Sequence, residues 1–188
     1  RQLFLHFTRH QIVTKCWRKR NGQWTVENAP FIDEWTEADY EELILDLQET
    51  VHSGGFVYAA FYNDQLKGFV SVGSNPFGNA HSYLDLTHIY VSEDMRRRGI
   101  GRTLFNAAKA WAKAHAAEKL YISAHSAAES QAFYRSMGCV EANEYNLSPL
   151  EKKPFLQPLL HMQEFTRFIV LKGQGTSLVY NEKGEQLL

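Results

Sequence analysis

Residues 84–111 constrain the fold of this chain more than any other part of the sequence. The first part, residues 84–91, is rich in β-branched and aromatic side chains and predicts a strand. After a short polar turn, apolar residues recur at helical spacing at Ile100, Leu104, Ala108 and Trp111. The pattern is therefore strand, turn, helix.

Two glycines lie where the turn becomes the helix, in the run Arg96-Arg97-Arg98-Gly99-Ile100-Gly101. Glycines let a ligand approach the backbone, and the first N–H groups of a helix have no intrahelical partners. A helix N-terminus also carries about half a positive charge, which suits phosphate. A P-loop would need Lys-Ser/Thr after its last glycine, and a dinucleotide fingerprint would need a small residue at Leu104. The alternative is a basic, solvated helix start with two incidental glycines.

The pattern Arg96-x-x-Gly99-x-Gly101, after a strand and opening a helix, resembles the acyl-CoA pyrophosphate loop of the GNAT N-acetyltransferase superfamily. The resemblance covers about residues 56–145 and identifies the chain as a member. It implies an α/β fold whose sheet is mixed and mostly antiparallel, with a central parallel strand pair and flanking helices. We expect this domain over residues 1–150, and an extension over residues 151–188 that completes or extends the sheet.

Composition excludes several classes of protein. The 188 residues suffice for one domain, and a net charge of −1 provides no general attraction to nucleic acid or an anionic membrane. No apolar run approaches the roughly 20 residues of a membrane span. Cys16 and Cys139 are too few for a disulfide framework and lack zinc-site spacing, so we expect no metal and a cytoplasmic location. The start at Arg1 rather than Met leaves open whether an upstream piece, with a first strand, is missing.

The N-terminal third is harder to interpret. Leu3, Phe7, Val13 and Trp17 fall near one helical face, so we predict a helix over residues 3–17 that stops at Asn21-Gly22, with a short initial strand as the alternative. The cations of residues 17–20 would then be a solvated helix end, although nucleic-acid binders use similar runs. Residues 23–35 are predicted to be turn-rich.

The rest of the chain alternates strands and helices. The strands at 84–91 and 119–123 are joined through a helix and should be parallel neighbours. The other expected elements are a capped helix from Thr36 to about Gly54, a hairpin of residues 56–62 and 66–73, a helix over 127–137, a strand over 139–145, a strand within 155–171, and a small hairpin of residues 168–171 and 178–180.

The resemblance implies where acetyl-CoA binds. Its diphosphate would contact backbone N–H groups of residues 97–103, and its pantetheine arm would lie between two central strands that splay apart at a bulge. Ser126 stands near where many members carry an asparagine for CoA. The implied contacts are Ile89, Tyr90, Val91, Arg96, Arg97, Arg98, Gly99, Ile100, Gly101, Arg102, Thr103, Ser126 and Tyr134.

The implied activity is transfer of acetyl from acetyl-CoA to a primary amine of a small molecule or peptide, by direct attack through a tetrahedral intermediate. Deprotonating a lysine-like amine at pH 7 costs roughly 4 kcal/mol, which a general base offsets in part. Asp85 matches the position of the family's glutamate base, and His88, expected on the opposite face of the strand, and ordered water are alternatives. Tyr134 matches the tyrosine that assists the leaving thiolate, and His125 is a lesser acid or base candidate.

The sequence does not identify the acceptor molecule. By the same resemblance, aromatic residues of the N-terminal third are candidate substrate contacts, although core packing is the alternative for each: Trp24, Phe31, Trp35 and Tyr40. One alternative function is a catalytically inactive acyl-CoA-binding regulatory or sensor module. The other is a nucleic-acid binder, which the near-neutral net charge of the chain disfavours. A homodimer is left open.

Overall fold

The computed structural model describes residues 1–78, 82–142 and, as a strand, 166–170. No helix among these residues is long and apolar enough to cross a membrane. In chain order the elements are η1 (Gln2–Phe4), β1 (His10–Arg20), β2 (Gln23–Glu34), α1 (Glu37–His52), β3 (Phe56–Tyr62), β4 (Gln65–Val72), β5 (Tyr83–Val91), η3 (Glu93–Met95), α2 (Ile100–Ala114), β6 (Lys119–Ala124), α3 (Ala128–Ser136), β7 (Val140–Glu141) and β8 (Thr166–Val170).

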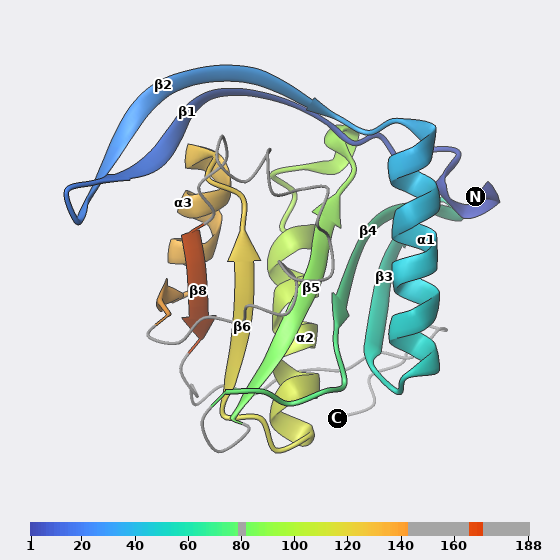
Figure 1. Ribbon diagram of the computed structural model, residues 1–188. Helices are drawn as coiled ribbons and strands as arrows, with labels where there is room; N and C mark the ends of the chain where they lie inside the picture. Colours follow the sequence, from blue (N-terminus) through green and yellow to red (C-terminus); the bar gives the residue numbers. More distant parts are fainter. Residues whose placement is uncertain (79–81, 143–165, 171–188) are drawn as a thin grey trace.

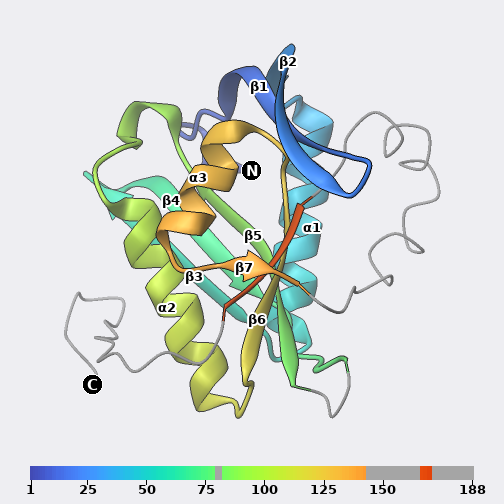
Figure 2. The ribbon, with the colours of Figure 1, turned by 90° about the vertical axis from the view of Figure 1, so that its left-hand side faces the viewer.

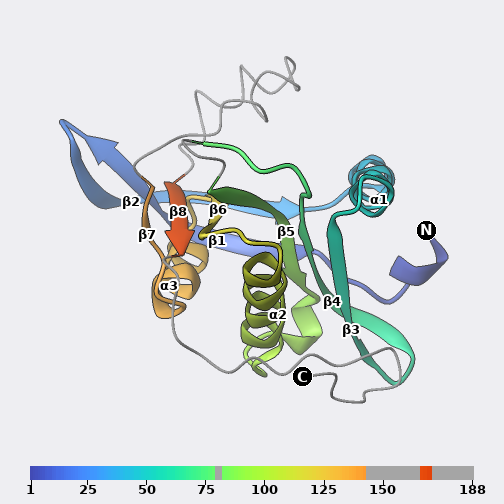
Figure 3. The same ribbon diagram turned by 90° about the horizontal axis from the view of Figure 1, so that it is seen from below.

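Six strands form the main sheet in the order β3-β4-β5-β6-β8-β7. The central pair β5–β6 is parallel and the other described pairs are antiparallel (Figure 1). Helix α2 covers one face of the sheet and α1 covers the other, as Figure 3 shows from below. The expected fold class, with its central parallel pair, is confirmed.

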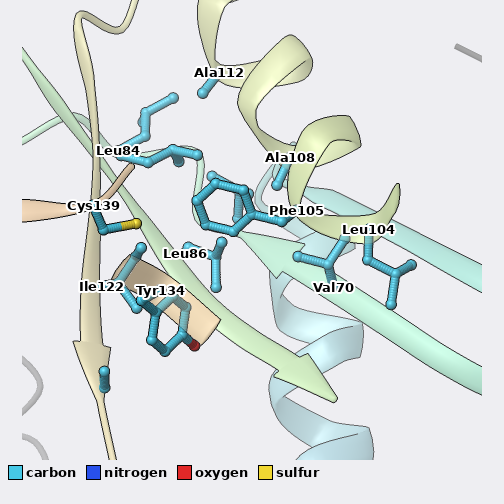
Figure 4. Packing of buried hydrophobic residues seen from close by; sticks show 13 residues of the cluster. Val70, Leu84, Leu86, Leu104, Phe105, Ala108, Ala112, Ile122, Tyr134 and Cys139 are labelled. Carbon is cyan, nitrogen blue, oxygen red and sulfur yellow. The ribbon is translucent and has the colours of Figure 1, made fainter. Parts of the chain in front are cut away.

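The main core lies between α2 and the sheet (Figure 4). Leu104 and Ala108 are fully buried there, as their helical spacing predicts, and they pack with Phe105 against Val70 and Leu84. Each buried side chain of this size contributes about 1.5–3 kcal/mol of hydrophobic stabilisation. This packing fixes α2 against the centre of the sheet.

A second, aromatic cluster packs α1 and the N-terminal segment onto the other face. It contains Phe4, Phe7, Tyr40 and Phe69, and the Tyr40 hydroxyl donates to the Phe7 carbonyl at 2.8 Å. The capping box predicted at Thr36 is confirmed, because its hydroxyl and the Asp39 carboxylate each accept a backbone N–H of the other residue. The N-terminal segment is thereby held beside α1.

The helix predicted over residues 3–17 is wrong, because most of that segment is strand β1. The register shifts between Val13 and Lys15, where Thr14 opposes both Ala29 and Pro30 of β2, and Val13 and Cys16 are both buried although they are three residues apart. Three-residue spacing of buried residues imitates a helix. The Asn21-Gly22 pair is the turn of a hairpin and has positive φ at both residues, 49° and 80°, as a two-residue hairpin loop requires.

Residues 23–34, predicted to be turn-rich, form β2, which pairs with β1 from His10↔Glu34 to Arg20↔Gln23. This β1–β2 hairpin is a separate two-stranded sheet that arches over the ends of β5 and β6 (Figure 1). Figure 2 shows α3 beneath it, and the Trp17 N–H donates to the Ser126 carbonyl at 2.9 Å. The hairpin therefore covers one end of the main sheet.

The C-terminal expectations are met in part. The strand expected within residues 155–171 is β8, which lies between β6 and β7 in the sheet. The strand expected over residues 139–145 is described only as β7, and residues 143–145 and 178–180 lie outside the described residues.

Candidate active site

The two parallel strands part at the centre of the sheet. Their pairing runs from Tyr83↔Lys119 to Leu86↔Ile122 and then stops, although β5 continues to Val91. On its other edge β5 has a bulge, since Ser71 and Val72 pair with His88 and Leu86 and leave Thr87 as an extra residue. Beyond Leu86, the backbone of β5 therefore has no ladder partner in β6, and the strands open like a V.

The bulge also decides which side chains share a face. Leu84 and Leu86 point into the core under α2, so Asp85 points to the opposite face. His88 lies on that same face, because its Nε2 is 3.6 Å from Asp46 Oδ2 of α1. The expectation that Asp85 and His88 point to opposite faces is wrong, because the extra residue interrupts the alternation of the strand.

The predicted phosphate loop lies beside the parted strands. Arg97 and Gly99 have positive φ, 61° and 85°, and α2 begins at Ile100. A Cβ on Gly99 would meet nothing within 4 Å, whereas one on Gly101 would be 3.3 Å from Phe133 Cε2 of α3. Gly99 thus leaves an open approach to the backbone, and Gly101 allows close packing of α2 on α3.

The helix start presents donors and cations together. The first intrahelical bond runs from the Thr103 N–H to the Gly99 carbonyl, so the N–H groups of residues 100–102 have no acceptor within the helix. The side chains of Arg97, Arg98 and Arg102 are exposed. Arg96 is half-buried, its Nε donates to the Val91 carbonyl at 3.3 Å, and burial lowers its pKa. This arrangement suits a diphosphate.

A buried lysine anchors the turn that leads into the loop. Lys67 of β4 donates from Nζ to Asp94 Oδ2 at 2.8 Å and to the His6 carbonyl at 2.9 Å. The Ser92 hydroxyl donates to Asp94 Oδ1 and accepts the Thr8 N–H. The hydrogen bonds from Lys67 and Ser92 lower the pKa of Asp94. The loop is therefore attached to a rigid support.

Tyr134 of α3 points into the core near the parted strands, in the cluster that contains Leu86 and Ile122 (Figure 4). Burial raises its pKa above the ordinary value, with Tyr90 and the Cys139 thiol as further causes. The phenol thus keeps its proton at neutral pH. It is suited to donate a hydrogen bond rather than to act as a base.

Ser126 and His125 occupy the link between β6 and α3. Ser126 is 2% exposed, and its hydroxyl accepts from Arg18 Nη1 at 2.8 Å, so this side chain fastens the hairpin. It does not cap α3, whose N-cap is Ala127. His125 Nδ1 accepts the Ala127 N–H at 3.1 Å, and burial lowers the His125 pKa, so the ring is neutral with its proton on Nε2.

The inner face of the hairpin adds residues that the sequence reasoning missed. Asp33 forms an ion pair with Arg9, whose side chain is 9% exposed. On either side of Asp33, Phe31 lies against His125 and Trp35 lies against Tyr90, with ring centroids 5.4 and 4.6 Å apart. The spacing Phe31-x-Asp33-x-Trp35 is the sequence signal that could have placed Asp33 on one strand face with two aromatic residues.

Neither cysteine is placed for nucleophilic chemistry. Cys16 is fully buried on the inner face of the hairpin, and Cys139 is 6% exposed. Burial raises the pKa of the Cys139 thiol to about 12, so the reactive thiolate is scarce at neutral pH.

The comparisons with known proteins agree with this geometry. The model of the Acetyltransferase (GNAT) family matches residues 20–139. No curated protein sequence matches the chain significantly. Among solved structures, a nourseothricin acetyltransferase is 15% identical with a TM-score of 0.66, and 92% of each chain is covered.

Two further structures contain the co-substrate. A protein assigned as a streptothricin acetyltransferase from Bacillus anthracis, in complex with acetyl coenzyme A, is 19% identical with a TM-score of 0.65, covering 88% of this chain and 89% of that one. A GNAT family acetyltransferase from Elizabethkingia anophelis with acetyl-CoA bound is 20% identical with a TM-score of 0.50, covering 70% and 82%. Since the family model matches more than half of its length, the chain belongs to the GNAT acetyltransferase family.

Proposed function

We propose that this protein is an N-acetyltransferase that transfers acetyl from acetyl-CoA to a primary amine of a small molecule or peptide. Acetyl-CoA is the co-substrate that family membership indicates. Two structures of the same fold contain it. We propose that the acceptor is a primary amine and that the acetyl group is transferred to its nitrogen rather than to an oxygen.

One observation carries the proposal: β5 and β6 part beside the bulge at Thr87, at the same end of the sheet as the N-terminus of α2. The backbone N–H groups of residues 97–103 would hold the diphosphate, with Arg96 and Arg102 as additional charges. The backbone of Ile89, Tyr90 and Val91, which has no ladder partner in β6, would bind the amides of the arm. A thioester entering the V from α2 would then reach the Asp85 and His88 side of the sheet.

On that side a base is needed, because the attacking amine must lose its proton. Asp85 and His88 lie on the same face, so either can act directly or through ordered water. Tyr134, which keeps its proton, would donate a hydrogen bond to the departing sulfur. Direct attack of the amine on the thioester carbonyl is favoured over an acetyl-cysteine intermediate, because burial suppresses the thiolate of Cys139.

The test is thiol release from acetyl-CoA in the presence of a library of primary amines, with mass spectrometry of the products. We expect amine-dependent release and a product that resists alkaline hydroxylamine, which cleaves esters and leaves amides intact. A hydroxylamine-sensitive product would indicate transfer to oxygen. Tight acetyl-CoA binding without release would instead support the sensor module.

A further inference from the structure

The inner face of the β1–β2 hairpin is mostly apolar, with Val13, Cys16 and Phe31 in one packed cluster. At the end of the hairpin opposite its turn, the same face carries the charged pair Arg9 and Asp33, and the Arg9 side chain is only 9% exposed. An antiparallel sheet with one solvated face usually keeps its charged residues on the outer face. Charged groups on the covered face therefore need a reason, and a polar ligand beneath the hairpin would supply one.

The neighbours of Asp33 on the inner face place it above the V. The side chains of residues 31, 33 and 35 lie on the inner face of the hairpin, with Asp33 in the middle, while residues 32 and 34 are exposed on the outer face. Phe31 contacts His125, just after β6, and Trp35 contacts Tyr90 of β5. These contacts lie on the two sides of the opening between β5 and β6. Asp33 therefore lies above the opening between β5 and β6, through which an acceptor would reach the thioester.

Asp33 is held in place by Arg9 and still has binding capacity. Arg9 Nη2 donates to Asp33 Oδ2, Arg9 Nη1 donates to Gln11, and the guanidinium lies 5.3 Å from the centroid of the Tyr90 ring. Among the described residues, Asp33 Oδ1 has no hydrogen-bond partner, and the side chain is 22% exposed. The same Arg9 guanidinium lies 5.9 Å from the centroid of the Trp35 ring, so a cation already occupies both rings. The carboxylate oxygen Oδ1 is therefore the group that can accept a hydrogen bond from an ammonium.

The other charged groups near Asp33 are already engaged. Arg18 donates to Ser126, and burial keeps His125 neutral at pH 7. Arg96 is one of the residues proposed above to bind the diphosphate, so its charge would be offset once acetyl-CoA is bound. Arg9 offsets the charge of Asp33, so what Asp33 offers the acceptor is the hydrogen-bonding capacity of its second oxygen, Oδ1.

We propose, given the acetyltransferase function above, that Asp33 binds a second ammonium group of the acceptor. Tyr90, which Trp35 contacts, lies two residues along β5 from His88 at the bulge, a rise of about 6–7 Å, and we take this rise as the spacing between the two nitrogens of the acceptor. The reacting nitrogen must lose its proton near the bulge, so the group at Asp33 is a different nitrogen. The acceptor class is then a diamine whose nitrogens are separated by about four or five carbons.

The experiment measures thiol release with 1,4-diaminobutane and with 1-aminobutane, which lacks the second ammonium. Loss of a charge-assisted hydrogen bond changes binding by about 10- to 100-fold. We expect the wild-type protein to prefer the diamine in kcat/KM by about that factor. Asp33→Asn should remove the preference, chiefly by raising KM for the diamine.

Glu34→Gln is the matched control, because it removes the same charge from the adjacent, exposed position on the outer face of β2. It should keep the diamine preference. Asp33→Glu retains a partner for Arg9, so folding is protected, and its longer side chain should shift the preference toward 1,3-diaminopropane.

The two proposals fail in different ways. Equal kcat/KM of the wild-type protein for the diamine and the monoamine would overturn the assignment of Asp33 alone. An Asp33→Asn variant that loses kcat equally with both amines would also overturn it, since that result describes a base. Absence of thiol release from wild-type protein with every amine would overturn the acetyltransferase proposal and this inference with it.

Discussion

Gly99 provides a sharp test of the diphosphate loop, because its substitution by alanine has two separable effects. Gly99 has a φ of +85°, and a Cβ there would meet nothing within 4 Å. The first effect is backbone strain, since an L-residue with left-handed φ costs about 1–2 kcal/mol. For a chain of this size, that cost lowers Tm by about 2–8 °C.

The second effect concerns the ligand. The new methyl group would occupy the open space through which the diphosphate approaches the N–H groups at the start of α2. Loss of one hydrogen bond to a charged group costs about 1.5–3 kcal/mol, so Kd for acetyl-CoA should rise about 10- to 100-fold. Gly99→Glu adds a negative charge at the same place and should abolish binding.

A matched control separates the two effects. Gly54, after the end of α1, has a φ of +79°, and a Cβ there also has nothing within 4 Å. Gly54→Ala should therefore cause a similar loss of Tm and leave acetyl-CoA affinity unchanged. Titration calorimetry and thermal unfolding of both variants measure these quantities. Equal Kd values for Gly99→Ala and Gly54→Ala would refute the placement of the diphosphate at this loop.

Three further substitutions test the chemistry and the His125 environment. Tyr134→Phe should lower kcat about 10- to 100-fold with little change in KM for acetyl-CoA, and an unchanged kcat would remove Tyr134 from the mechanism. Tyr83→Phe, which removes another buried hydroxyl, is the control and should lower stability only. Asp85→Asn should alter the pH–rate profile, and an identical profile would transfer the base to His88 or ordered water. Because burial lowers the His125 pKa, the unfolded chain binds more protons below the ordinary value of about 6.5, so stability falls as pH decreases through that region. His125→Gln should weaken this dependence in urea unfolding at pH 7.5 and 5.0, and parallel curves for the two proteins would contradict the assignment.

Local patterns were enough to predict most of the elements that build the site. The spacing of Leu104 and Ala108 predicts the buried face of α2, and the capping box at Thr36 predicts the start of α1. The positive φ of Gly99 agrees with a glycine at the helix start. These features depend on residues within a few positions of one another, and a single sequence displays such relations directly.

Long-range contacts could not be predicted in the same way. The Arg9–Asp33 pair forms only because β1 and β2 are paired, and that pairing was hidden when residues 3–17 were interpreted as a helix. Likewise, Ser126 accepts from Arg18, 108 positions away, so the sequence around Ser126 carries no sign of its partner. Both contacts involve the hairpin.

The two main errors in the sequence interpretation both fall where the strand pairing is irregular. A bulge adds one residue to one strand of a pair and disturbs the ladder there. Between Val13 and Lys15 the extra residue belongs to β2, where Ala29 and Pro30 oppose Thr14, and Val13 and Cys16 of β1 both pack with Ala127. Bulges also bend strands and increase their twist, which suits a hairpin that must reach from Tyr90 on one side of the opening to His125 on the other.

The bulge in β5 changes which side chains face the candidate active site. The extra residue Thr87 turns His88 to the face that Asp85 occupies and lies where pairing with β6 ends. A regular β5 would keep only one of these two candidate bases facing the acceptor. The bulge at Thr87 thus lies where β5 and β6 part, and the other bulge lies in the hairpin that covers this opening. An interrupted alternation in the strands therefore indicates the region of the candidate active site.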